Sequence, residues 1–79
     1  MKATVTITLK PGLLDAQGTT IRSALAALGF KRVTDVRVGK YLEIELNGAK
    51  GAAAKQAVTR MCQQLLANPV VETYRIDMR

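Results

Sequence analysis

The chain has 79 residues and a formal net charge of +6, with one cysteine and no histidine. A single small domain of this length has a marginal core, so we expect association with another chain to stabilise it. The composition excludes an internal disulfide, a histidine base and a membrane-spanning run of about 18 apolar residues. We therefore expect one domain, residues 1–79, in the cytoplasm and without membrane contact.

Residues 2–10 alternate, with apolar side chains at the odd positions and threonines among the even ones. This pattern predicts a strand with one buried face, which the β-branched threonines also favour. The alternation starts at the N-terminus, where no apolar signal core is found.

The stretch from Lys10 to Gly18 follows neither a strand nor a helix pattern. It contains Pro11, which a central strand does not accept, and Asp15, which can cap a following helix. A connection of this kind can bind an anion. However, it lacks the glycine spacing of phosphate loops, and Asp15 would compete with an anion for the same amides. We expect a strand-to-helix connection or a partner contact, followed by a helix that Gly29 ends.

Residues 32–47 predict two further strands, with a turn or bulge at Gly39 and Lys40. The apolar alternation continues on both sides of this turn. Arg37 is expected to pair with Glu43 or Glu45 across the resulting hairpin.

A second helix is expected from residue 51 to about residue 67, with Ala54, Val58, Met61 and Leu65 on its apolar stripe. The pair at residues 68 and 69, asparagine and proline, ends it. Residues 70–78 alternate again and predict a last strand. A glutamate on its apolar side indicates an edge strand or one that a partner covers.

The predicted order is β-α-β-β-α-β, which defines an α+β protein with a ferredoxin-like arrangement. We expect a four-stranded antiparallel sheet with both helices on one face. The opposite face, which carries the threonines of the first strand, would be open in a monomer.

Catalysis is difficult to assign to this chain. Glu43 and Glu45 lie about 7 Å apart along one strand face and could form an acid/base pair, but a solvated strand face is the favoured interpretation. Cys62 lies beside an apolar stripe and is expected to be buried and structural. We assign no catalytic, cofactor-binding or metal-binding residue. Basic residues are dispersed and only three residues are aromatic, so nucleic acid is not an expected partner.

Four stretches of the sequence resemble conserved motifs of one known protein family. They are residues 9–18 (LKPGLLDAQG), 27–30 (ALGF), 36–43 (VRVGKYLE) and 65–74 (LLANPVVETY). Together they resemble PurS, the small subunit of bacterial and archaeal phosphoribosylformylglycinamidine synthase. The four span nearly the whole chain in the family's order. Ala16 departs from the pattern, because the family commonly has proline there, which presets the first helical turn.

The resemblance implies a homodimer or higher oligomer that acts as a non-catalytic structural subunit in purine synthesis. In that reaction, formylglycinamide ribonucleotide, glutamine and ATP give formylglycinamidine ribonucleotide, glutamate, ADP and phosphate. The implied partners are a large synthetase subunit, PurL, which uses ATP and Mg, and a glutaminase subunit, PurQ, which carries the nucleophilic cysteine. PurS would bind no cofactor, bridge these partners and aid ammonia transfer.

We expect partner contacts at three exposed connections: the first loop, the predicted hairpin and the corner before the last strand. The candidate residues are Lys10, Pro11, Gly12, Leu14, Asp15, Gln17, Gly18, Arg37, Gly39, Lys40, Asn68 and Pro69. Two alternatives have the same topology. Binding of amino acids or nucleotides to the isolated chain would favour a small-ligand regulatory module, and salt-dependent RNA binding would favour an RNA-binding domain.

Overall fold

The computed structural model describes residues 1–48 and 50–79. In chain order, the described elements are β1 (Lys2–Leu9), α1 (Ala16–Ala27), β2 (Lys40–Glu45), α2 (Gly51–Met61), a π-helical turn (Cys62–Leu66) and β3 (Glu72–Met78). The predicted α+β class is confirmed. Within the described residues, no helix is long and apolar enough to cross a membrane.

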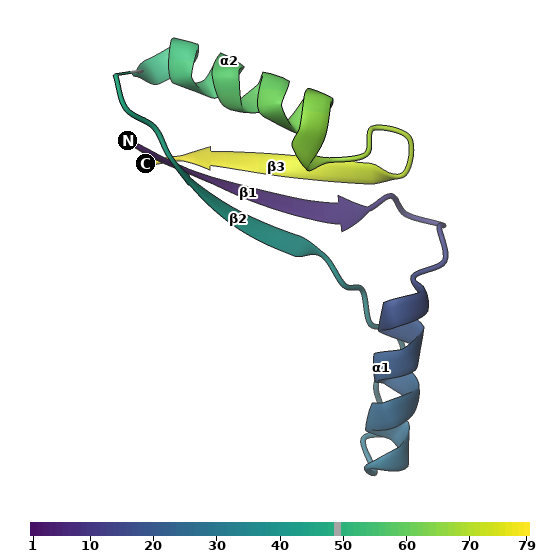
Figure 1. Cartoon of the computed structure of the whole chain (residues 1–79). Coiled ribbons are helices and arrows are strands. Elements are labelled where there is room, and N and C mark those ends of the chain that lie inside the picture. The colour runs from purple at the N-terminus through teal and green to yellow at the C-terminus, as the bar shows by residue number, and fades with distance from the viewer. Residues whose placement is uncertain (49) are drawn as a thin grey trace.

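The sheet has the order β2-β1-β3, and both pairings are antiparallel (Figure 1). Val5 in the central strand lies opposite Leu42 on one side and Ile76 on the other, so these apolar residues share a face. Residues 3, 5 and 7 of β1 are completely buried on that face. Threonines occupy the opposite face, as the alternation predicts.

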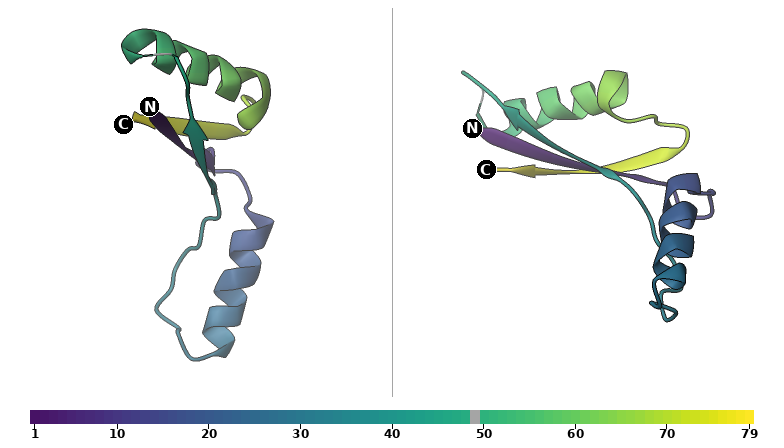
Figure 2. Two further views of the ribbon diagram at one scale, coloured as in Figure 1. Left: turned by 60° about the vertical axis from the view of Figure 1, so that its left-hand side comes forward. Right: turned by 60° about the horizontal axis from the view of Figure 1, so that its bottom comes forward.

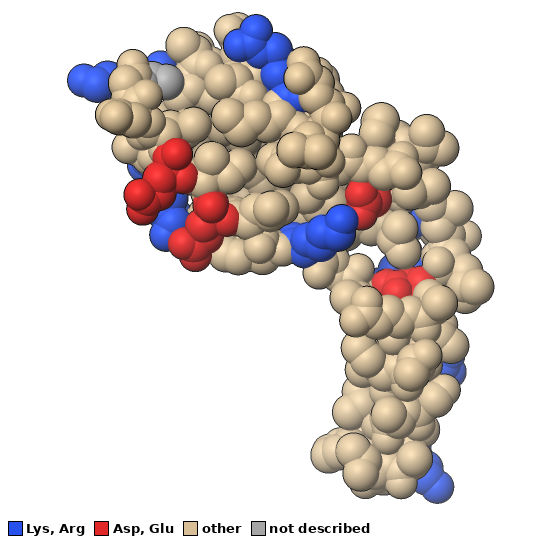
Figure 3. All heavy atoms as spheres, in the orientation of Figure 1, with Lys and Arg blue, Asp and Glu red and all other residues tan. Residues whose placement is uncertain are grey.

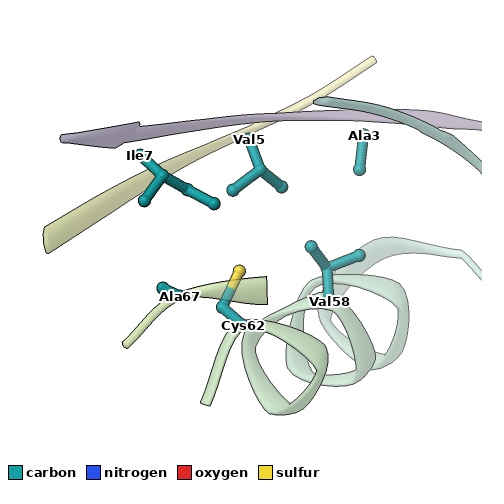
Figure 4. Packing of buried hydrophobic residues seen from close by; sticks show 6 residues of the cluster. All are labelled: Ala3, Val5, Ile7, Val58, Cys62 and Ala67. Carbon is teal, nitrogen blue, oxygen red and sulfur yellow. The ribbon is translucent and has the colours of Figure 1, made fainter. Parts of the chain in front are cut away.

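Helix α2 covers the apolar face of the sheet. Figure 4 shows Val5 and Ile7 of β1 pointing toward Val58 and Cys62, which are completely buried, and toward Ala67 at the end of the π-helical turn. Cys62 is therefore a core residue, as predicted. The apolar core consists mainly of this one strand and this one helix, because α2 is the only helix in the described residues that packs on the sheet.

The expected apolar stripe of α2 is wrong at Leu65, which is 83% exposed. The amide of Ala67 donates to the carbonyl of Cys62 at 3.0 Å, five residues earlier, so the last turn is wider than an α-helical turn. This widening turns Leu65 toward solvent and brings Leu66 and Ala67 toward the sheet.

The described residues form a three-stranded sheet covered by one helix, and not the expected four-stranded sheet with two helices on one face. Helix α1 points away from the sheet, and residues 31–39 run back beside it without joining the sheet (Figures 1 and 2). We call this unit, residues 14–39, the arm. Gly39 and Lys40 make no turn, so the arm continues into β2 in an extended path. The predicted second strand, residues 32–38, is thus outside the sheet in the described structure.

The arm gives the chain an elongated shape. The principal extents are 50 × 24 × 14 Å, and the Cα radius of gyration is 16.1 Å. A compact chain of this length has a radius of gyration of about 12 Å. The chain exposes 5893 Å², whereas a compact monomer of its mass exposes about 4,700 Å². One chain therefore leaves much more surface uncovered than a self-sufficient domain.

Candidate partner-contact site

The three connections predicted from the sequence meet at one end of the sheet. The Lys10 ammonium donates to the carbonyl of Pro69 at 3.0 Å, which joins the first loop to the corner before β3. The Arg37 guanidinium donates to the carbonyls of Leu13 at 2.8 Å and Lys10 at 3.2 Å. We call this cluster, residues 10–18, 37–40 and 68–69, the junction.

Asp15 holds the base of the arm together. Its carboxylate accepts a hydrogen bond from the Gly18 amide at 2.8 Å, which caps α1 as predicted. The second carboxylate oxygen accepts from the Val38 amide at 2.7 Å, on the returning segment. These amides, that of Val38 foremost, lower the pKa of Asp15 below its usual value of 3.8.

Two glycines let backbone segments approach each other in the junction. A Cβ atom at Gly18 would overlap the carbonyl of Val36, so α1 lies directly against the returning segment. A Cβ atom at Gly39 would lie 2.5 Å from the carbonyl oxygen of Ile7, at the end of β1. Both positions therefore require a residue without a side chain.

The corner before β3 is ordered by its own polar groups. The Asn68 side chain accepts from the Val70 amide at 3.0 Å, and the Glu72 carboxylate accepts from the Asn68 amide at 2.7 Å. The other oxygen of Glu72 lies 3.9 Å from the Lys40 ammonium. Glu72 therefore links the corner to the start of β2. Glu72 was not among the predicted site residues. Its charge on the apolar face of the predicted strand was the feature that could have indicated its role.

Some of the predicted partner-contact residues are exposed in the junction and others are buried. Asp15 and Gly18 are buried and Lys10 is half-buried, so these three act inside the chain. The sequence predicted only the capping role of Asp15, and the structure shows that all three residues make contacts within the chain. The other nine candidates are exposed: Pro11, Gly12, Leu14, Gln17, Arg37, Gly39, Lys40, Asn68 and Pro69.

Outside the junction, Glu43 and Cys62 have structural surroundings, an ion pair for the carboxylate and the apolar core for the thiol. Glu43 pairs with Lys2 at 2.6 Å on the exposed sheet face, so the predicted pairing with Arg37 is wrong. Burial raises the pKa of the Cys62 thiol. Among the described residues, no group of three or more histidine, cysteine, aspartate or glutamate side chains could hold a metal ion.

Comparison with known proteins identifies relatives that match nearly the whole chain. The model of the family PurS, phosphoribosylformylglycinamidine (FGAM) synthase, matches residues 2–79. A PurS subunit from Synechocystis sp. is 46% identical over 72 residues, which cover 91% of this chain and 72% of that protein. The structure of Bacillus subtilis PurS aligns with a TM-score of 0.87 and 38% identity, covering 96% of this chain and 94% of that one. A chain in the structure of PurLQS from Thermotoga maritima aligns with a TM-score of 0.86 and 29% identity, covering 96% and 93%.

The fold and the junction define a small α+β protein in which loop contacts at one end of a sheet set the direction of a projecting helix. The chain belongs to the PurS family. It is the PurS subunit of phosphoribosylformylglycinamidine synthase, a ligase complex of purine biosynthesis, which confirms the resemblance seen in the sequence.

Replacement of Gly18 by alanine tests the close approach within the arm. Helix propensity alone would make Gly18→Ala stabilising by about 1 kcal/mol. We expect the reverse, destabilisation by about 1–3 kcal/mol, because the new methyl group would overlap the Val36 backbone. Urea denaturation at fixed protein concentration measures the change, and Ser23→Ala on an exposed part of α1 is the control. A stabilised Gly18→Ala protein would contradict the observed approach.

The lowered pKa of Asp15 predicts a pH dependence of stability. The ionised carboxylate stabilises the folded chain fully above its unfolded pKa of about 3.8, and this stabilisation is lost as the pH falls through the lower folded pKa. Asp15→Asn should therefore be less stable than the parent near pH 7, and the difference should shrink below about pH 4. Urea midpoints across this range measure it, with Asp35→Asn as a control. A difference independent of pH would refute the role of the charge.

Proposed function

We propose that this chain is a non-catalytic structural subunit that bridges the PurL synthetase and PurQ glutaminase subunits and aids ammonia transfer between them. The observation that carries the proposal is the likeness of the chain to one in the structure of PurLQS from Thermotoga maritima. In this proposal ATP and Mg are used by the synthetase subunit, no cofactor is bound by the chain, and the complex works in the cytoplasm.

The proposed contact with these subunits is the exposed part of the junction. Lys40, Gln17 and Pro69 come from separate segments and lie at the same end of the molecule. The hydrogen bonds of Lys10, Asp15 and Arg37 hold these segments in place, so the surface is preorganised for a partner. The chain is proposed to act as a homodimer or higher oligomer, because its elongated form leaves a large area uncovered. The four-stranded ferredoxin-like sheet belongs, in this proposal, to the assembled protein.

Reconstitution tests the structural role. The chain is added to, or omitted from, the matching PurL and PurQ subunits, and formation of formylglycinamidine ribonucleotide from glutamine is followed. We expect omission to reduce the glutamine-dependent rate by about tenfold or more, equivalent to about 1.4 kcal/mol. Synthesis from an ammonium salt is the control, since it does not require transfer from the glutaminase. An unchanged glutamine-dependent rate without the chain would refute the proposal.

Added negative charge on the exposed part of the junction tests the contact surface. Gln17→Glu and Lys40→Glu should each raise the amount of chain needed for half-maximal glutamine-dependent synthesis by about fivefold or more. Lys55→Glu, on the exposed side of α2, should behave as the parent does. Thermal unfolding of each variant separates a lost contact from a lost fold. If both junction variants support synthesis at the parent concentration, the junction is not the contact surface.

A further inference from the structure

A hollow of about 350 Å³ lies between the π-helical turn and the start of β3. Three of its lining residues, Cys62, Ala67 and Tyr74, belong to the apolar core or pack against it. Two polar side chains, those of Gln63 and Glu72, also line it. Pockets for small molecules usually measure about 300–1,000 Å³, so a hollow at the small end of this range suits a single side chain of a partner protein.

The Glu72 carboxylate at this hollow is incompletely paired within the chain. One of its oxygens accepts a hydrogen bond from the Asn68 amide at 2.7 Å. The other lies 3.9 Å from the Lys40 ammonium, which is too far for a hydrogen bond, and no other described residue donates to it. The Glu72 side chain is only 15% exposed, so water screens its charge weakly. A shielded carboxylate with a free acceptor oxygen favours a further cationic donor.

A carboxylate in a hollow is an uncommon feature on the surface of this chain. The sequence has 12 basic and only six acidic residues. In the view of Figure 3 the carboxylates occupy a few separate places, and the surface between them is mainly uncharged or basic. A cationic group of a partner is therefore directed to those few places, of which the Glu72 hollow also offers an apolar lining.

The side chain that matches this lining has an apolar stem and a positive end. The methylene stem of an arginine would pack against Ala67 and Tyr74, and its guanidinium would donate to the Glu72 carboxylate and to the amide oxygen of Gln63. Arginine fits better than lysine because its guanidinium is more weakly hydrated and carries five donors in a planar fork. No arginine of the chain itself lines the hollow in the described structure, so a partner must supply it.

We propose that an arginine side chain of the catalytic subunit that contacts the junction docks in this hollow, with its guanidinium on the Glu72 carboxylate. The hollow is continuous with the junction, since Pro69 belongs to both and Glu72 lies beside Lys40. One partner surface can therefore cover both. This inference rests on the proposed bridging function and specifies one contact within it.

Calorimetric titration of the full-length chain with the matching PurL and PurQ subunits, singly and together, tests the docking. Glu72→Gln keeps an acceptor for the Asn68 amide and removes the charge. We expect it to raise the Kd for the subunit that binds the parent chain by about tenfold or more. Glu45→Gln, the same change at an exposed position of β2, is the matched control and should bind as the parent does.

A second variant tests the hollow without changing Glu72. Gln63 is exposed, and Gln63→Trp would place an indole ring at the hollow and exclude the docked side chain. We expect a similar rise in Kd. Gln64→Trp, at the next exposed position and outside the lining, is its control. Thermal unfolding identifies any variant that has lost its fold, and Gln63→Trp decides the matter if Glu72→Gln is such a variant.

Each alternative has its own result. Parent-like binding by a folded Glu72→Gln or Gln63→Trp chain would overturn the docking and leave the bridging function intact. A change in the sedimenting size of the variant chain alone, with unchanged binding to PurL and PurQ, would assign the hollow to a second copy and would also overturn it. A parent chain that binds neither subunit would contradict the bridging function and the docking together.

Discussion

The Asp15 carboxylate accepts hydrogen bonds from the amides of Gly18 and Val38, and so ties the start of α1 to the segment that returns from it. Arg37 ties the same segment to the loop after β1. These contacts set the direction of α1, which lies beside residues 31–39 and not on the sheet. The elongated shape and the position of residues 31–39 outside the described sheet both follow from this local arrangement.

The division of the chain into two parts fits the structural role that we propose for it. The sheet and α2 share a core centred on Val5, Ile7 and Val58. The arm has no such core and depends on the junction for its position. A folded body with a projecting, preorganised unit is suited to joining other subunits, because the contact surface is ordered before the partner arrives.

Local patterns were sufficient to predict most elements and all three segments of the junction. The alternation of β1, the cap at Asp15 and the stop at Gly29 depend on neighbouring residues, and the structure shows each of them. The hairpin at Gly39 was predicted because glycine permits a turn, but Gly39 is needed for its approach to Ile7, far away in sequence. The outward rotation of Leu65 likewise depends on one widened turn. Such contacts leave no periodic signal, so the position of residues 32–38 outside the sheet, the direction of α1 and the bond between Asp15 and Val38 could not be predicted.

Hydrogen exchange of the backbone amides of residues 33–37, measured at several protein concentrations, tests the central claim most directly. In the described structure, no backbone hydrogen bond from these amides ties residues 33–37 to the sheet. If a second copy covers these residues in the proposed homodimer, the protection of their amides should rise as dimer forms and fall on dilution. Fast exchange at concentrations where the protein sediments as a dimer, or protection that persists in the monomer, would contradict the account.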